Sequence, residues 1–97
     1  MNKNEIISFL KSKKDLLSKE YGVKTIGLFG SYVDDQYGEK SDIDIVVEFC
    51  RDKKNIHNFL AVKRYLENNL NREVDLGIES NLKPAIKDNI KNQIIYV

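Results

Sequence analysis

Two aspartates separated by one residue are the side chains best suited to chemistry in this chain. Asp42 and Asp44 stand at the start of an apolar run that continues to Phe49. In a strand, residues i and i+2 point to the same side, with Cα atoms about 6.5 Å apart. Two convergent carboxylates can hold divalent cations, and paired metal ions about 3.5–4 Å apart are a common device for nucleotidyl transfer. The pair therefore predicts metal-dependent phosphate chemistry.

A Gly-Ser pair supplies a second part of such a site. Gly30 and Ser31 end the preceding apolar run, where we expect a strand to turn into a helix. Backbone N–H groups at a turn of this kind can bind phosphates. Ser41, directly before Asp42, is expected to hydrogen-bond locally and orient the loop. Gly30, Ser31 and Ser41 are thus the predicted nucleotide-binding residues.

A third carboxylate, Asp75, lies in a short run in which Val74 and Leu76 face one way and Glu73 and Asp75 the other. If this run pairs beside the Asp42 strand, Asp75 joins the same cluster. Three adjacent carboxylates repel one another unless a cation is bound. The predicted catalytic and metal-binding residues are therefore Asp42, Asp44 and Asp75.

Each of these motifs alone has a simpler explanation. Isolated Asp-x-Asp pairs and Gly-Ser turns are common on solvated surfaces, and only their combination is specific. Glu48 continues the aspartate face of its strand, where it either supports the site or is simply exposed. Tyr32 and Tyr37 lie close to the proposed phosphate loop, but we expect both to be surface tyrosines.

The apolar pattern predicts helices alternating with strands in a single domain, an α/β or α+β layer fold. The first helix begins with a capping box of Asn2 and Glu5 and ends at Gly22. Pro84 suits the first turn of the last helix. The further expected elements are strands at 23–29, 42–49, 72–78 and 94–97, a short helix or turn at 31–37, and helices at 55–70 and 82–91.

Composition limits the function classes. The 97 residues form one domain, 1–97, and their net charge of +1 gives no basic field for gripping nucleic acid. The single Cys50 has no Cys or His cluster around it, which argues against a zinc site. Neither a signal peptide nor an apolar run near about 18 residues is visible. We therefore expect no membrane association and a cytoplasmic location.

The combined motifs resemble a known family. Gly30-Ser31, Ser41-Asp42-Ile43-Asp44 and Val74-Asp75-Leu76 are similar to the signature of the minimal nucleotidyltransferases, members of the DNA polymerase β-type superfamily. The resemblance covers nearly the whole chain. It implies a small mixed sheet flanked by helices, two Mg²⁺ ions, and ATP as substrate. It also implies an antitoxin that transfers AMP to a tyrosine of a HEPN-domain toxin.

One departure from the family pattern leaves the activity open. Members usually read Gly-Ser-x-x-Arg-Gly, whereas Asp34 and Asp35 occupy the last two positions here. A carboxylate repels phosphate, so Lys40, Arg51, Lys53 or a partner residue would have to replace the arginine. The first alternative is a weakened or inactive antitoxin that acts only by binding its toxin. The second is a nucleotidyltransferase subunit that acts on small molecules or nucleic acid.

Overall fold

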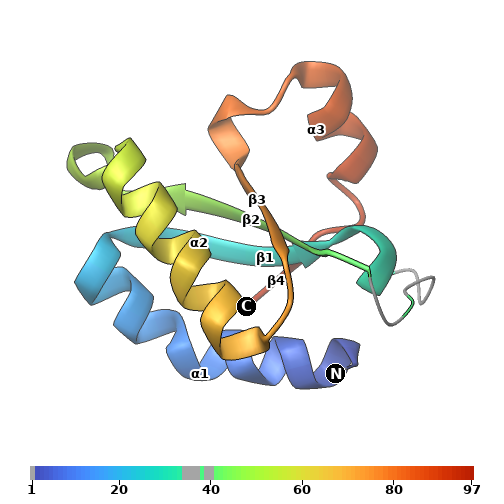
Figure 1. Cartoon of the computed structure of the whole chain (residues 1–97). Coiled ribbons are helices and arrows are strands. Elements are labelled where there is room, and N and C mark those ends of the chain that lie inside the picture. Colours follow the sequence, from blue (N-terminus) through green and yellow to red (C-terminus); the bar gives the residue numbers. More distant parts are fainter. Residues whose placement is uncertain (1, 34–37, 39–40) are drawn as a thin grey trace.

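The computed structural model describes residues 2–33, 38 and 41–97. Within these residues the chain alternates helices with the strands of one sheet (Figure 1). The elements are α1 (Lys3–Tyr21), β1 (Val23–Phe29), the 3-10 turn η1 (Gly30–Tyr32), β2 (Ile43–Phe49), η2 (Arg51–Lys53), α2 (Ile56–Leu70), β3 (Val74–Ile78), η3 (Glu79–Asn81), α3 (Pro84–Ile90) and β4 (Ile95–Tyr96).

The ends of the helices follow the predicted capping chemistry. The Asn2 side chain accepts the Glu5 N–H at 2.9 Å, and the Glu5 carboxylate accepts the Asn2 N–H at 3.1 Å. Gly22 closes α1 at a φ of 74°, in the left-handed region that glycine tolerates. At the start of α2 the Asn55 side chain accepts the Asn58 N–H at 2.8 Å. The capping box and the glycine C-cap are both confirmed.

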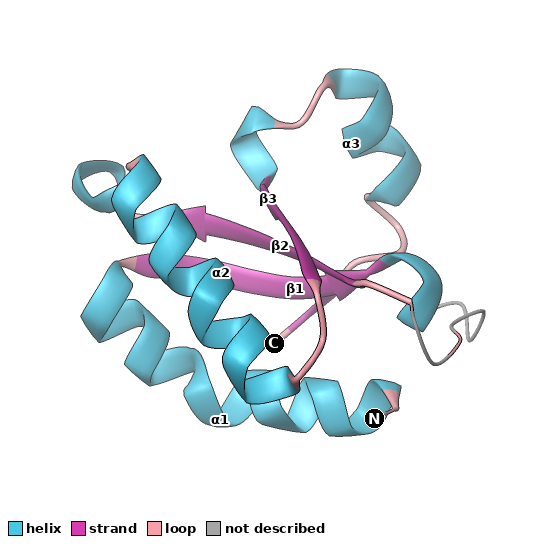
Figure 2. Cartoon of the chain, in the orientation of Figure 1, coloured by secondary structure: helices cyan, strands magenta, loops and turns pink. Residues whose placement is uncertain are grey.

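The four strands form one mixed sheet in the order β3-β2-β1-β4 (Figure 2). β1 pairs antiparallel with β2 and with β4, whereas β2 pairs parallel with β3. A parallel pair needs a crossover connection, which α2 provides between β2 and β3. This arrangement confirms the predicted mixed sheet flanked by helices and places β3 beside the strand that carries Asp44.

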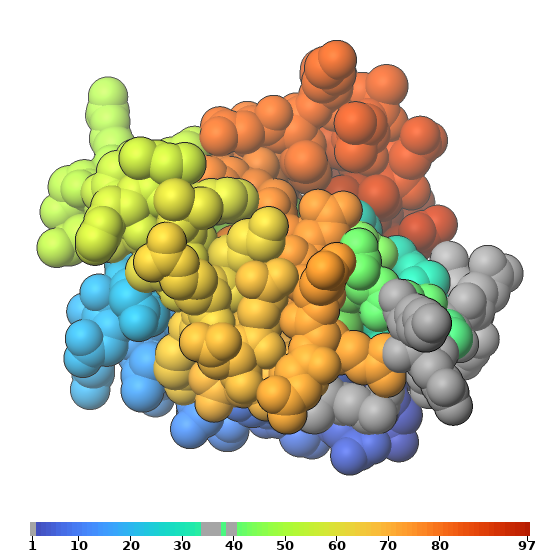
Figure 3. All heavy atoms as spheres, viewed as in Figure 1, coloured from blue at the N-terminus to red at the C-terminus, as the bar shows by residue number. Residues whose placement is uncertain are grey.

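The hydrophobic core lies between one face of the sheet and the two long helices. α1 and α2 both cover this face, and Figure 3 shows α2, in yellow, over the middle of the molecule. From Ile26 onward in β1 and along β2, every second residue points into it, and the fully buried residues include Ile26, Leu28, Ile43 and Ile45. The period-2 alternation of the sequence therefore determines which strand residues are left for the opposite face.

The opposite face is covered in part by the segment that carries α3. Gly27, Val46 and Gly77 form one row across three strands. A Cβ on Gly27 would lie 2.5 Å from Ile94 Cγ2, and one on Gly77 would lie 3.5 Å from Leu82 Cδ2. Gly27 therefore lets the chain around Ile94 and Ile95 approach the sheet closely. The next row of this face, beyond Val46, carries Asp44.

Within the described residues, no helix combines the length and the apolar character needed to cross a membrane.

Candidate active site

The carboxylates that the sequence singles out lie at one end of the sheet. Asp44 of β2 and Asp75 of β3 are direct partners in the parallel register, on the face away from α1 and α2. Asp42 precedes β2 by one residue, so the strand begins at Ile43, one position later than predicted. Asp44 is half-buried, whereas Asp42 and Asp75 are exposed. The strand pairing thus places Asp75 beside Asp44 although they are 31 positions apart in the sequence.

Gly30 lies directly against the Asp44 side chain. Its φ is +78°, a conformation that side-chain-bearing residues rarely adopt. A Cβ at this position would lie 2.1 Å from Asp44 Oδ2 and 2.8 Å from its Cγ, so any larger residue would displace the carboxylate. The Ser31 backbone N–H donates a hydrogen bond to the same carboxylate. The Gly-Ser pair therefore positions Asp44 in addition to any contact with phosphate.

The electrostatics of Asp44 differ from those of an ordinary surface aspartate. Burial, together with the neighbouring charges of Asp75 and Asp42, raises its pKa from 3.8 to about 6. The hydrogen bond from Ser31 acts in the opposite direction but does not cancel the rise. Nearby like charges and desolvation both disfavour the ionised form. A cation bound at this end of the sheet would relieve this repulsion.

The donor set suits a hard divalent cation. Carboxylate oxygens are the ligands that Mg²⁺ prefers, and Asp75 is close enough to Asp44 to share a hydrogen bond when Asp44 is protonated. Among the described residues, no three His, Cys, Asp or Glu side chains converge closely enough to form a complete metal site. Asp44 and Asp75 are thus the pair that could begin such a site, and Asp42, whose charge also raises the pKa of Asp44, is the candidate for a third ligand.

The loop before β2 is described only in part. Gly38 N–H donates to Ser41 Oγ at 2.8 Å, and Ser41 N–H donates to the Gly38 carbonyl at 3.2 Å. The predicted local hydrogen bonding of Ser41 is therefore confirmed. Asp34, Asp35 and the proposed substitute cation Lys40 lie outside the described residues. The predicted short helix at 31–37 is represented by η1, and its residues 34–37 also lie outside them.

Tyr32 corrects one expectation. We expected a surface tyrosine, but its side chain is fully buried in the core cluster with Ile6 and Leu10 of α1. Tyr32 is the last residue of the turn η1, which directs this ring inward. Sequence alone gave no sign of this burial. Tyr37, for which the same expectation was stated, lies outside the described residues.

Glu48, at the other end of the aspartate face, is part of a different cluster. Its carboxylate accepts the Phe49 N–H at 3.1 Å and the Ser80 N–H at 3.2 Å. Lys54 lies 3.6 Å from the same carboxylate and also donates to the Ser80 hydroxyl. No pattern in the sequence marks Lys54 or Ser80, because their meeting depends on how η2 and η3 approach each other.

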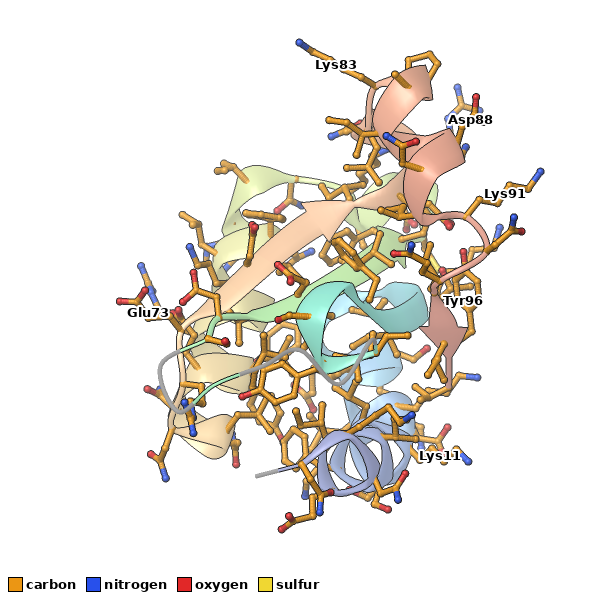
Figure 4. All side chains as sticks on the ribbon, turned by 90° about the vertical axis from the view of Figure 1, so that its right-hand side faces the viewer. Lys11, Glu73, Lys83, Asp88, Lys91 and Tyr96 are labelled. Atoms are coloured by element: carbon orange, nitrogen blue, oxygen red, sulfur yellow. The ribbon has the colours of Figure 1, made fainter. Side chains whose placement is uncertain are left out.

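Figure 4 shows the molecule turned so that the two edges of the sheet lie on either side. Glu73, directly before β3, lies on one side, and Tyr96 of β4 lies on the other. The Tyr96 hydroxyl donates to Glu79, and this bond, followed by burial, raises the pKa of Tyr96 to about 12. Lys83 and Lys91 point outward from the α3 region. The α3 segment is therefore tied to the sheet while its own lysines face solvent.

Comparison with known proteins agrees with this arrangement. The nucleotidyltransferase domain family matches residues 9–97. The protein adenylyltransferase MntA of Thermococcus cleftensis is 39% identical over 93 residues, which cover 96% of this chain and 93% of that protein.

Two solved structures share the fold. One, described provisionally as a minimal nucleotidyltransferase, superposes with a TM-score of 0.83 at 23% identity, over 98% of this chain and 95% of that one. The other is a toxin–antitoxin complex with AMP-PNP, with a TM-score of 0.70 at 25% identity, over 99% of this chain and 72% of that one. The chain therefore belongs to the nucleotidyltransferase family and is an enzyme of its minimal, MntA-like branch.

Proposed function

We propose that this protein uses Mg²⁺ to transfer AMP from ATP to a tyrosine hydroxyl of a HEPN-domain toxin, and thereby acts as its antitoxin. The observation that carries the proposal is the Asp44–Asp75 pair, in register on adjacent strands and with Gly30 held against Asp44. The name of the Thermococcus relative, a protein adenylyltransferase, supports a protein acceptor. The resemblance to antitoxins of HEPN/MNT pairs supports the identity of that acceptor.

In this proposal each residue has a distinct part. Asp42, Asp44 and Asp75 would hold two Mg²⁺ ions, which would supply charge neutralisation and Lewis-acid chemistry at the phosphates. Gly30, Ser31 and Ser41 border the triphosphate. Because Asp75 is exposed and lies on a different strand from the Asp-x-Asp pair, it can approach an incoming hydroxyl. We assign it the role of general base.

The transfer balances as a simple displacement. The acceptor oxygen forms a bond to the α-phosphorus, while the bond from that phosphorus to the oxygen bridging to the β-phosphate breaks. Pyrophosphate leaves with the electron pair of the broken bond, and the hydroxyl proton passes to Asp75. The product is a phosphodiester of AMP with the acceptor. Position and charge stabilisation supply the catalysis, as in other phosphate transfers.

A co-expression experiment tests the proposal. Asp75→Asn should still bind ATP, with affinity within about threefold of wild type, but should transfer AMP roughly 10²- to 10⁴-fold more slowly. Intact-mass spectrometry of a co-expressed HEPN-domain protein measures the adduct. Asp88→Asn, an exposed acid-to-amide change on α3, is the matched control. Equal adduct formation by Asp75→Asn and wild type would contradict the role of Asp75.

A second candidate function rests on Asp34 and Asp35, which replace the arginine and glycine of the family pattern. In this reading the protein keeps the fold but neutralises its toxin by binding alone. The two candidates separate in the same experiment. Neutralisation of the toxin by wild type without any adduct would favour binding, whereas an adduct lost with Asp42→Asn and Asp44→Asn would favour transfer.

A further inference from the structure

The Asp75 carboxylate has little support from other side chains. Asp75 is exposed near the start of β3, and the described side chain beside it is Asp44, which repels it when both are ionised. Among the described residues, no hydrogen bond or ion pair from a third side chain reaches the Asp75 carboxylate. Asp44, in contrast, is held by the Ser31 N–H and lies against Gly30. The position of the Asp75 carboxylate therefore depends on how its own main chain is held.

The main chain at the start of β3 is held on both sides. Toward the sheet, the Ile43 N–H donates to the Glu73 carbonyl at 3.0 Å. The parallel register, with Ile43 opposite Val74, then turns the Val74 N–H away from β2. On that outer side the Glu67 carboxylate accepts the Val74 N–H at 3.1 Å. The two residues directly before Asp75 are thus fixed from opposite sides, one by β2 and one by α2.

Glu67 spans the turn between α2 and β3. Its main-chain carbonyl accepts the Asn71 N–H at 2.9 Å, which closes α2, and its side chain reaches Val74. Figure 1 shows this short connection from the end of α2 to the start of β3. Because β3 is an edge strand, Glu67 is the only acceptor that the described residues offer to the Val74 N–H. Val74 is 2% exposed, so loss of this acceptor would leave a buried donor unsatisfied and loosen the end of the strand.

Helix stability does not explain an acid at position 67. Glu67 lies in the last turn of α2, where the helix dipole disfavours negative charge, and no basic residue of that turn offsets it. An ionised carboxylate is, however, a stronger hydrogen-bond acceptor than a neutral group. The side chain is half-buried and bonded to the start of β3. The bond to Val74 therefore accounts for the acid better than the helix does.

We propose that Glu67 is the positioning residue of Asp75. Its hydrogen bond to Val74 holds the start of β3, so that the Asp75 carboxylate stays beside Asp44. This inference rests on the proposed function, in which Asp75 takes the proton of the acceptor hydroxyl. Glu67 acts through the main chain and not on ATP, so its loss should slow transfer without weakening ATP binding. A displacement of about 1 Å at a reacting group can cost about 10²-fold in rate.

Two substitutions at position 67 separate the hydrogen bond from the charge. Glu67→Gln keeps an acceptor oxygen at the same reach, whereas Glu67→Met keeps the length and removes the acceptor. Single-turnover transfer of AMP to a HEPN-domain protein should fall at least about tenfold for Glu67→Met and less than about threefold for Glu67→Gln. ATP affinity should stay within about twofold in both. Arg64→Met, at an exposed position of the same helix, is the matched control and should transfer as wild type. Equal losses in the two variants of Glu67 would assign the effect to charge and overturn the proposal.

A double-mutant cycle tests whether the effect passes through Asp75. In an Asp75→Asn background, Glu67→Met should slow transfer by less than about twofold further, since the carboxylate that Glu67 positions is gone. The urea midpoint should fall by the same amount in both backgrounds, because the bond to Val74 is lost in each. A merely structural role would slow transfer equally in both backgrounds, and that result would overturn the proposal.

Two further measurements do not need transfer. In ¹⁵N-labelled protein, Glu67→Met should speed hydrogen exchange at the Val74 N–H at least about tenfold, and Glu67→Gln should leave it within about threefold of wild type. Mn²⁺ alone should bind at least about threefold more weakly to Glu67→Met and equally well to Glu67→Gln. If both differences appear but wild type modifies no acceptor, the proposed function fails while the role of Glu67 at the carboxylates stands. Unchanged Val74 exchange or Mn²⁺ affinity in Glu67→Met would overturn the inference itself.

Discussion

The two ends of β2 carry a carboxylate each, on the same face of the same strand, and their surroundings are opposite. Asp44 is surrounded by Asp75 and Asp42, and its pKa rises to about 6. At Glu48, burial alone would raise the pKa. The hydrogen bonds from Ser80 and Phe49, together with the Lys54 charge, outweigh burial and hold it below the usual range.

This contrast separates a structural carboxylate from a functional one. Glu48 has its charge satisfied by the protein, and in doing so it joins η2 and η3 to the sheet. Asp44 receives one backbone hydrogen bond, from Ser31, and is otherwise left beside like charges. A carboxylate charge without an opposite charge nearby weakens the fold unless a bound ligand compensates it. Residues with pKa values perturbed in this way cluster at functional sites.

The largest effect should be on adenylyl transfer. Asp44→Asn should reduce the rate by roughly 10³-fold or more, because it removes a carboxylate at the centre of the phosphate site. Glu48→Gln should change the rate by less than about threefold, since Glu48 binds only protein groups. Single-turnover transfer of labelled AMP measures both. Similar losses in the two variants would show that the two ends of β2 do not differ in function.

Gly30 is the next most sensitive position. Gly30→Ala should destabilise the fold by about 1–2 kcal/mol, because alanine disfavours the left-handed backbone and its Cβ would meet Asp44. Gly38→Ala is the matched control, since a Cβ there would have nothing within 4 Å. Urea unfolding of both variants gives the comparison. A Gly30→Ala protein as stable as wild type would mean that the loop can move away from Asp44.

The two carboxylates should also respond to pH with opposite signs. Because the pKa of Asp44 is raised in the folded state, the protonated carboxyl stabilises the fold. This stabilisation is complete at pH values below the ordinary pKa of 3.8 and is lost as the pH rises through about 6. At pH 7 without divalent cations, Asp44→Asn should therefore be more stable than wild type by about 1 kcal/mol, after discounting for solvent screening. The difference should disappear near pH 3.8.

The pKa of Glu48 is lowered in the folded state, so its ionised carboxylate stabilises the fold. This stabilisation is present at pH values above the pKa of Glu48 in the unfolded chain and is lost as the pH falls through its pKa in the folded protein. Glu48→Gln should accordingly be less stable than wild type at neutral pH, by up to about 1 kcal/mol. Thermal unfolding of both variants across the pH range measures the two effects. Stability changes of the same sign in both variants would contradict the opposite electrostatic surroundings of Asp44 and Glu48.

The smallest effect concerns the charge at position 34. Asp34→Arg should tighten ATP binding by up to about 1 kcal/mol, since it exchanges a charge that repels phosphate for one that attracts it. Titration calorimetry in matched salt, with Asp15→Arg on exposed α1 as the charge control, measures the change. An equal gain in ATP affinity in both variants would show that the effect comes from the net charge of the protein and not from position 34.

Much of the fold and of the candidate site follows from local patterns in the sequence. The capping box at Asn2 and Glu5 depends on residues three apart, so it is readable without any tertiary contact. The strand boundaries at 23–29 agree with prediction, while β2 and β3 begin slightly later than expected. The later start reflects pairing, because a strand begins where its partner offers hydrogen bonds, as Glu73 does to Ile43.

The period-2 alternation of the sequence places Asp44 and Asp75 on the side of their strands away from the buried aliphatic residues, so the two carboxylates are able to meet. Their actual meeting depends on the tertiary structure, through the parallel register of β2 and β3. Packing likewise decides the burial of Tyr32, the contact of Gly30 with Asp44, and the hydrogen bond from the Val74 N–H to Glu67. Each depends on contacts between segments distant in the chain, and short-range spacing carries no information about these contacts.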